Sequence, residues 1–523
     1  MKKKIFVFSS AVLLLSSCND FLDKMPDSRT ELDTEEKVTA LLVSAYPESH
    51  AIVMQEMASD NAMDNGMQYS VEDKSQEEAY RWQDISTISS DTPKGFWGAC
   101  YGAVAAANHA LEAIEKMGNP ASLNAQRGEA LMCRAWGHFL LSNVFCYAYN
   151  PETANTDMGL PYSTEPEKTV RPNYERGTMQ KLYENIEKDI EEALPLINDE
   201  LYDVPKYHFN KQAALAFAAR FFLNYQKWDL ASKYATDCLG TNPVSLLRDW
   251  NEMQSYGITN DMDPRCNLYI KASNKCNFLL QTTISMVGFI FSNYGYITKY
   301  SHDSYISTNE TLQATNIWGE SNSSTMRCPT LVFKGGTMDR ALVAKLPRLF
   351  EETDPVSQTG YYHSVVVPFR SDILLLERAE AYIMQKKYTE AAKDLTTWMQ
   401  NWTKSTLTLD PDTIQKFYNS FGYYTSTAPT PKKHLNPSFE IDEEGSVQEC
   451  MLQCVLNFKR IETIHEGMRW FDVKRYGINI TRRVMNQDSE CDHVTDSLGT
   501  NDLRRAIQLP FDIIAAGLER NPR

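Results

Sequence analysis

The chain has 523 residues, with 52 Lys or Arg against 68 Asp or Glu, and its formal net charge is −16. With 42% hydrophobic and 23% charged residues, it has the composition of a globular protein with ample material for a large core. Binding nucleic acid requires a basic stripe that displaces counterions, and docking on anionic lipid by charge requires a basic surface. The acidic balance argues against both classes of partner and identifies none.

The N-terminus is typical of a bacterial lipoprotein signal. Lysines at 2–4 precede a mostly apolar stretch over 5–15, which is too short to span a bilayer core of about 30 Å. The sequence LSSC at 15–18 resembles the lipoprotein box. We therefore expect residues 1–17 to be removed and Cys18 to be acylated, which would hold the protein at a membrane. The alternative is an ordinary signal peptide that happens to be cleaved beside a cysteine.

Ten more cysteines follow in a chain that we expect to be exported, where disulfides can form. Cys266 and Cys276 flank a short polar segment and are placed to close a bridge. No C-x₂-C spacing occurs, so no zinc site is expected. The cysteines that lie within helical patterns are expected to be buried free thiols: Cys100, Cys133, Cys146, Cys238, Cys450 and Cys454.

Helical periodicity is the main signal along the first part of the chain. It predicts helices over about 34–46, 92–117, 124–147 and 178–194. Residues 59–91 are polar and rich in turn-forming residues, so they are predicted to form a loop.

An internal repeat relates residues 213–238 to residues 373–398. Small and aromatic positions coincide after a shift of 160 residues: Ala219 with Ala379, Phe222 with Tyr382, Trp228 with Tyr388, and Ala231 with Ala391. This is the pattern of tetratricopeptide hairpins, in which small residues let two antiparallel helices approach. Residues 241–370 and 404–446 have few helical periods, and insertions of this kind often gather on a binding face.

Catalytic motifs are weak or absent in the sequence. His465-Glu466 lacks the second histidine of a metalloprotease, and no G-x-S-x-G or phosphate loop occurs. Glu462, Glu466, Arg469 and Asp472 have the helical spacing of ion-paired neighbours, which favours a structural role. Adjacent acids such as Glu351-Glu352 do not define the separation of about 5–9.5 Å that a glycosidase needs. We expect neither catalytic residues nor a metal site.

A series of short motifs runs in order over nearly the whole chain: Cys18, Phe21-Leu22-Asp23, Pro26, Phe96-Trp97-Gly98-Ala99-Cys100-Tyr101, Ala107-Asn108, Gly128-Glu129-Ala130, Arg134-Ala135, Ala213-Ala214-Leu215, Ala219-Arg220, Phe369-Arg370, Leu374-Leu375-Leu376, Ala379-Glu380-Ala381, Glu466-Gly467-Met468-Arg469-Trp470-Phe471-Asp472-Val473-Lys474-Arg475 and Asn521-Pro522. This series resembles the SusD/RagB family, the nutrient-capturing surface lipoproteins of Bacteroidetes. The family usually has Glu-Arg shortly before the Glu-Gly pair, where this chain has Phe458-Lys459.

The resemblance implies a mainly α fold, a tetratricopeptide-like helical-hairpin scaffold with irregular loop-rich insertions. A single SusD-like domain would occupy residues 18–523 after the signal peptide at 1–17. We expect its parts to lie as follows: helical scaffold over about 34–240, 370–403 and 447–475, and ligand-binding insertions over about 241–369 and 404–446.

The resemblance also implies a function. SusD-like proteins capture oligosaccharide at the outer membrane, deliver it to a SusC-like TonB-dependent transporter, and carry out no chemistry. We therefore expect a glycan ligand, this transporter as partner, attachment to the outer membrane through Cys18 with the protein facing the exterior, and no cofactor and no nucleic acid. The alternatives are the same scaffold with peptide cargo, a surface glycoside hydrolase, or a pure interaction scaffold.

Aromatic residues in polar loops indicate where a sugar would bind, because flat rings stack on its C–H face. Residues 289–318 contain seven aromatics, and a second patch lies at 69–82. In SusD-like proteins loops in these two regions hold the ligand. The alternative for each ring is that it anchors its loop to the scaffold, and a third patch at 418–424 is equally ambiguous. The resemblance therefore implies stacking and polar ligand residues: Trp82, Tyr294, Tyr296 and Trp318, with Arg81 and Asn61.

Overall fold

The computed structural model describes residues 32–71, 73–167, 174–256, 262–292, 299–335, 338–486, 488 and 490–523. The predicted signal peptide at 1–17 and the predicted lipid site at Cys18 lie outside these residues. Within the described ranges, no helix is long and apolar enough to cross a membrane.

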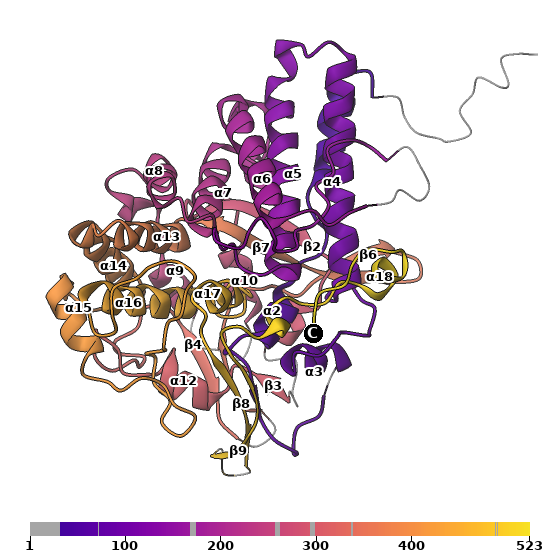
Figure 1. Cartoon of the computed structure of the whole chain (residues 1–523). Coiled ribbons are helices and arrows are strands. Elements are labelled where there is room, and N and C mark those ends of the chain that lie inside the picture. The colour runs from indigo at the N-terminus through magenta and orange to yellow at the C-terminus, as the bar shows by residue number, and fades with distance from the viewer. Residues whose placement is uncertain are drawn as a thin grey trace, which may run out of the picture.

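The N-terminal half is built from long helices that stand side by side (Figure 1). The helices predicted over 92–117, 124–147 and 178–194 are confirmed, but the predicted loop at 59–91 contains a short helix. That helix begins where the Asp73 carboxylate accepts a hydrogen bond from the Ser75 backbone N–H. The helices are α1 (Glu35–Leu42), α2 (Ile52–Ala58), α3 (Lys74–Tyr80), α4 (Pro93–Lys116), α5 (Asn124–Phe145), α6 (Met179–Ala193), α7 (Lys211–Asn224) and α8 (Trp228–Leu239).

The second half alternates short helices within the insertions and longer helices of the scaffold. The long ones, α13, α14 and α16, lie together beside α8 and α15 (Figure 1). The elements are α9 (Trp250–Ser255), α10 (Asp263–Tyr269), α11 (Val287–Ile290), α12 (Ser304–Glu310), α13 (Ser371–Met384), α14 (Tyr388–Trp402), α15 (Pro411–Tyr418), α16 (Val447–Glu462), α17 (Arg469–Arg475) and α18 (Phe511–Ala515).

The sequence repeat is a pair of matching helical hairpins, α7–α8 and α13–α14. Ala219 and Ala379 are buried at the equivalent position of each copy. The turns match as well, because Gln226 and Lys386, also 160 positions apart, have φ values of 62° and 58°. The two copies pack on each other through α8 and α13, where the Gln385 side chain donates to the Trp228 carbonyl at 2.8 Å. The predicted mainly α, tetratricopeptide-like scaffold is confirmed.

Within the described residues, three small sheets form in the irregular segments. Strands β2 and β7, both within the segment of few helical periods, pair antiparallel with each other, with Leu279 opposite Phe369. The sheets have the orders β3-β1-β8-β9, β2-β7-β6 and β4-β5. The strands are β1 (Met63–Asp64), β2 (Asn277–Thr283), β3 (Tyr300–Ser301), β4 (Thr330–Phe333), β5 (Arg340–Val343), β6 (Leu349–Asp354), β7 (Thr359–Arg370), β8 (Ile480–Met485) and β9 (Cys491–Leu498).

The structure does not form the disulfide that the sequence allowed between Cys266 and Cys276. Cys276 is a buried free thiol, while Cys266 packs with Met262 and Leu342 in a separate small apolar cluster. The six cysteines predicted within helical patterns are buried thiols, as expected.

The acidic and basic residues around Glu466 have the predicted structural role, but with different partners. Instead of pairing along one helix, Glu466 binds Arg370 at 2.8 Å and Arg469 binds Asp60 at 2.7 Å. Asp472 binds Lys459 at 2.5 Å. These ion pairs therefore join separate elements of the scaffold.

Candidate functional site

Two of the predicted binding regions meet around the sheet β3-β1-β8-β9. Strand β1 pairs antiparallel with β3, with Met63 opposite Ser301, and parallel with β8, with Asp64 opposite Val484. Beside this pairing, the Lys299 backbone N–H donates to the Ser70 carbonyl at 3.2 Å. The loop that precedes the first long helix pair thus lies next to the segment that leads into α12.

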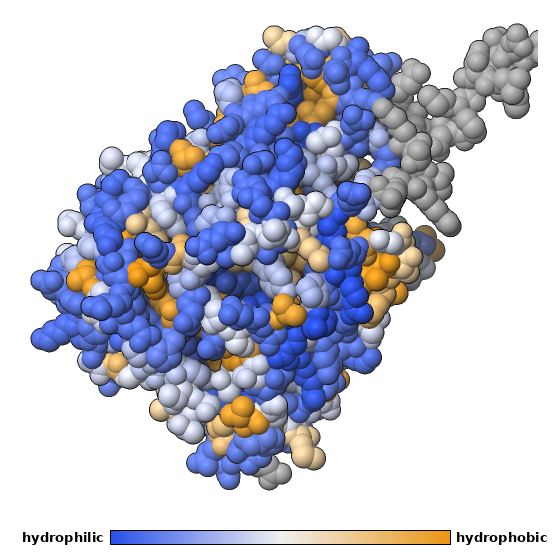
Figure 2. All heavy atoms as spheres, viewed as in Figure 1, coloured by the Kyte–Doolittle hydropathy of each residue, from blue (hydrophilic) through white to orange (hydrophobic). Residues whose placement is uncertain are grey.

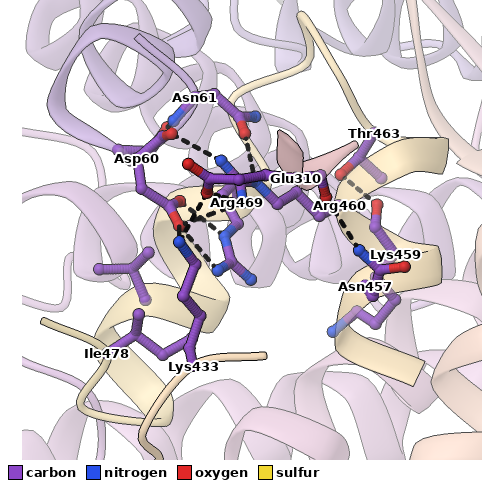
Figure 3. A network of polar contacts seen from close by, with 12 residues as sticks. Asp60, Asn61, Glu310, Lys433, Asn457, Lys459, Arg460, Thr463, Arg469 and Ile478 are labelled. Carbon is purple, nitrogen blue, oxygen red and sulfur yellow. Dashed lines mark hydrogen bonds and ion pairs between the residues drawn. The ribbon is translucent and has the colours of Figure 1, made fainter. Parts of the chain in front are cut away.

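A buried network of charges fixes these loops to the scaffold (Figure 3). The Asp60 carboxylate accepts hydrogen bonds from Arg469 at 2.7 and 2.9 Å. The Glu310 carboxylate accepts from Lys433 at 2.6 Å and from Arg460 at 2.8 Å. The network thus ties the loop at Asp60 and the end of α12 to helices α16 and α17.

Electrostatics keeps this network charged even though it is buried. Burial favours a neutral Asp60, but Arg460 and Arg469 hold the pKa of its carboxyl well below the usual range. Burial, opposed by Glu310, lowers the pKa of the Lys433 ammonium to about 8. With every charge paired inside the protein, the network positions the loops and offers no group to a ligand.

The exposed side of this region is polar. The Arg81 side chain is 51% exposed and pairs with Glu77 at 2.9 Å. Lys299 donates to the Asp64 carboxylate at 2.7 Å. The ring of Tyr300 is buried against that of Tyr80 at a centroid distance of 4.4 Å. The described residues therefore present hydrogen-bonding groups here, without an exposed aromatic ring.

Two of the predicted ligand residues lie inside the protein, which corrects the expectation for them. Asn61 is fully buried and its side-chain oxygen accepts from Arg460 at 2.8 Å. Trp82 is 5% exposed, and its indole N–H donates to the Ala58 carbonyl at 2.8 Å. The guanidinium of Arg482 lies 4.3 Å from the Trp82 ring. Neither side chain has a free surface for a ligand, so both anchor their loop.

Of the remaining predicted residues, Arg81 and Trp318 lie within the described ranges. Arg81 is exposed, as binding requires. Trp318 is half-buried against the scaffold, with its ring 5.4 Å from that of Phe458 in α16. Tyr294 and Tyr296 lie outside the described residues. Ligand contact by these side chains stays a prediction.

The ambiguous aromatics at 418–424 have different surroundings. Tyr418 is fully buried. The ring of Tyr423 stacks on His434 at 4.3 Å, and Lys433 lies 3.4 Å from the ring of Tyr424. These contacts favour the anchoring role for this patch.

An aromatic hollow of about 200 Å³ lies elsewhere, between α4 and the C-terminal segment. Apolar side chains gather on the surface where α18 lies (Figure 2). The hollow is lined by rings, apolar groups and carboxylates from three stretches of chain: Trp97, Tyr101 and Ala105; Pro161, Ser163, Glu165, Glu167 and Tyr174; and Ile513, Ala516, Gly517 and Leu518.

Hydrogen bonds fix the geometry of this aromatic hollow. The rings of Trp97 and Tyr101 lie one helical turn apart at 4.8 Å, and the Tyr101 hydroxyl donates to the Pro161 carbonyl at 2.9 Å. Tyr174 is 40% exposed and donates to Glu167 at 2.7 Å. Partial burial and Glu167 raise the pKa of Tyr174 to about 12, so its hydroxyl is protonated at neutral pH.

The C-terminal wall of the aromatic hollow is held in place by Arg176. Its guanidinium donates to the Asn521 side chain at 2.6 Å and to the Gly159 carbonyl at 2.8 Å. Arg176 is itself buried, so these bonds join the C-terminal segment to the chain that precedes α6. The contact gives Asn521, the first residue of the Asn-Pro pair, a structural role.

The aromatic hollow was missed because its residues follow the same helical spacing as the core. Phe96 and Trp97 are consecutive, and neighbours on a helix point about 100° apart. Phe96 takes the core position, while Trp97 lines the hollow at its edge. Two consecutive aromatic residues cannot both lie on one face of a helix, so the Phe96-Trp97 pair was the sequence signal for a second aromatic surface. Rings beside carboxylates suit a sugar, whose C–H face stacks while its hydroxyls donate hydrogen bonds.

Comparisons with known proteins agree with this architecture. Residues 20–223 match a SusD-like family described as "Starch-binding associating with outer membrane". No protein of curated function matches the sequence.

Solved structures match almost the whole chain. A SusD superfamily protein from Bacteroides thetaiotaomicron is 17% identical, with a TM-score of 0.64 over 94% of this chain and 100% of that chain. A putative sugar binding protein from Bacteroides vulgatus is 16% identical, with a TM-score of 0.65 over 94% and 99%. A SusD-like carbohydrate binding protein from Bacteroides vulgatus is 15% identical, with a TM-score of 0.57 over 92% and 96%.

Proposed function

This chain is a SusD-like protein, and we propose from that premise that it is a carbohydrate-binding protein associated with the outer membrane. The description of the matching family supports both the class of ligand and the location. Two structural neighbours described as sugar or carbohydrate binding support the ligand class. Because these two structures are only 16% and 15% identical to this chain, the site itself must carry the chemistry.

The observation that carries the proposal is the aromatic hollow. Tyr174 offers an exposed ring in the same hollow as Trp97 and Tyr101, and Glu165 and Glu167 add acceptors beside them. Stacking between a ring and a sugar face needs no charge on the ligand. We further propose that the predicted loop residues Arg81, Tyr294, Tyr296 and Trp318 contact a longer glycan.

The finer parts of the proposal rest on the sequence. Cys18 carries the lipid anchor after removal of residues 1–17, and residues 18–523 act as one SusD-like domain facing the exterior. The bound oligosaccharide passes unchanged to a SusC-like TonB-dependent transporter, without a cofactor. Peptide cargo and glycoside hydrolysis are the competing functions, and they enter the test as outcomes.

Calorimetry with a panel of neutral oligosaccharides, beginning with starch-type α-glucans, tests the proposal. Tyr174→Ala is expected to weaken binding by at least tenfold. Tyr207→Ala is the matched control, because Tyr207 is also 40% exposed but lies outside the hollow. Arg81→Ala reports on the loop surface.

Several results would contradict parts of this assignment. Binding that survives Tyr174→Ala but is lost in Arg81→Ala places the site on the loops. Binding of peptides and of no glycan overturns the carbohydrate assignment. Release of reducing ends from a polymer shows hydrolysis, and pull-down of soluble partners without a transporter favours an interaction scaffold.

A further inference from the structure

A second hollow, of about 370 Å³, shares no residue with the aromatic hollow. Its volume falls in the range of small-molecule sites, about 300–1,000 Å³. It lies where the chain after α5 meets the ends of α17 and β9. Its wall is rich in hydroxyl and amide side chains: Tyr147, Asn150, Thr153, Asn436, Ser438, Thr500 and Asn501.

Three buried cationic residues line the hollow, Lys474, Arg475 and Arg505. Lys474 is 8% exposed, and its ammonium donates to the carbonyls of Asn143 and Cys146 at 2.5 and 2.8 Å. These carbonyls belong to the C-terminal end of α5, where the helix dipole favours a cation. Arg505 is 4% exposed and donates to the carbonyls of Val473 and Ile478 at 2.8 and 2.7 Å.

Neither Lys474 nor Arg505 forms an ion pair with a carboxylate of the described residues. The hydrogen bonds of Lys474 and Arg505 go to neutral carbonyls, and the carboxylate that acts on Arg505, that of Asp502, forms its ion pair with Arg504. A buried cation without a counter-charge is costly, and an anion that binds beside it recovers part of that cost. Burial lowers the pKa of Lys474 to about 7, in keeping with this lack of a counter-charge.

The other charged groups of the hollow are largely occupied. Arg475 pairs with Glu380 at 2.8 Å. Asp502 pairs with Arg504 at 2.8 Å. Asp157 accepts a hydrogen bond from the Thr153 hydroxyl at 2.5 Å. Lys474, where it is protonated, and Arg505 thus lie in the hollow without an ion pair, near Asp157, whose carboxylate has no cation partner in the described part of the chain.

The amides of the wall add hydrogen-bonding capacity. The side chains of Asn436 and Asn501 make no hydrogen bond within the described part of the chain, and both are exposed to solvent. An amide offers two donors and an acceptor, which matches the hydroxyls of a sugar. A simple inorganic anion would use the cations but not these amides.

We propose that this second hollow binds an acidic sugar, a hexuronate unit, with its carboxylate directed toward Lys474 and Arg505 and its hydroxyls toward Asn436 and Asn501. This inference rests on the proposed function and gives it a second, charge-selective site. It extends the cargo from neutral glycans to those that contain uronic acids.

The test compares D-glucuronate with D-glucose by calorimetry on the full mature protein, with sodium sulfate as a third ligand. Lys474 and Arg505 donate hydrogen bonds to backbone carbonyls, so replacing either residue risks unfolding the protein. The test therefore uses variants of Asn501, an exposed residue of the same hollow. Asn501→Glu adds a carboxylate to an exposed position, and Asn501→Gln is its matched control. We expect glucuronate to bind at least tenfold more tightly than glucose, with this preference lost in Asn501→Glu and kept in Asn501→Gln.

Three outcomes would overturn the inference. Glucuronate that binds no tighter than glucose removes the charge selectivity. Glucuronate binding that is unchanged in Asn501→Glu places the ligand elsewhere. Sulfate that binds as tightly as glucuronate shows an anion site without sugar recognition.

Failure of the proposed function is separable from failure of the inference. If neutral glycans bind in a way that depends on Tyr174, and glucuronate is not preferred, only the further inference is refuted. Glucuronate binding that depends on position 501, without any neutral glycan bound, supports this site and sinks the assignment of the aromatic hollow.

Discussion

Replacing Glu310 by Gln should cost the protein much of its stability, because the side chain neutralises several buried cations at once. The Glu310 carboxylate is 2% exposed, and it lies 2.6 Å from Lys433, 2.8 Å from Arg460 and 3.6 Å from Arg483. Breaking a buried ion pair by removing one partner typically costs about 3–5 kcal/mol. Asp60 remains 3.6 Å from Arg460 and 3.9 Å from Lys433, so we expect the lower end of that range.

Urea unfolding followed by circular dichroism and tryptophan fluorescence measures this loss. Glu352→Gln is the matched control, since Glu352 is exposed on β6, and it should change the unfolding free energy by less than about 0.5 kcal/mol. Adding Lys433→Met to Glu310→Gln should recover about 1–2 kcal/mol, because it removes one of the uncompensated cations. If Glu310→Gln proved no more destabilising than Glu352→Gln, the network would not hold the loops.

Other predictions concern acid stability, backbone fit and thiol exposure. Burial lowers the pKa of His50 to about 4, and that of His138 and His302 to about 3, so between pH 6.5 and 4 the unfolded chain takes up protons that the folded protein does not. Stability is complete above pH 6.5 and should fall below it by up to about 1.4 kcal/mol per histidine and pH unit, and urea midpoints should fall less steeply in His50→Gln. Gly477→Ala should lower the unfolding free energy by at least about 2 kcal/mol, because φ at Gly477 is 55° and a Cβ would lie 2.2 Å from the Asn436 carbonyl oxygen. Gly499 has open space around it, so Gly499→Ala should be neutral in the same assay. Cys491 is half-buried while the other described cysteines are buried, so Cys491→Ser should abolish the fast phase of labelling by a thiol reagent, and an unchanged fast phase would show another thiol exposed.

The parts of the fold that follow from local sequence were predictable, and the parts that follow from distant contacts were not. Helical spacing located α4, α5 and α6 because each helix buries a stripe made by its own residues. The repeat located both hairpins, down to the turn at Gln226 and Lys386. Trp82 and Asn61 were misjudged because Arg482 and Arg460, which bury them, lie about 400 residues further along.

The site was harder to predict than the scaffold because one residue type serves both. An aromatic ring in a polar loop can anchor that loop or stack on a sugar, and only tertiary contacts distinguish these roles. The aromatic hollow depends on Arg176 holding Asn521 near the other end of the chain. Trp82 is the opposite case, a loop aromatic that is buried and hydrogen-bonded inside the protein and so cannot contact a ligand.

The net charge of −16 falls mainly on the surface, because the many cations inside the protein are nearly balanced by buried acids. Arg265, Arg340, Arg370, Arg460, Arg482 and Arg483 are among the largest fully buried side chains. Arginine suits this role because irregular segments leave carbonyls without partners, and a guanidinium has five N–H donors. Arg482 alone donates to the carbonyls of Met57, Ala58, Ser59, Ala62 and Tyr80.

This distribution of charge has a consequence for the cargo. An acidic surface repels an acidic glycan at long range, so a hollow reached by buried cations without ion pairs is the favoured place to hold such a ligand. Lys474 and Arg505 provide such a place. Neutral glycans meet no such barrier and need only the stacking faces of the aromatic hollow. The two hollows therefore divide the possible cargo by charge, and the glucuronate and glucose titrations measure that division directly.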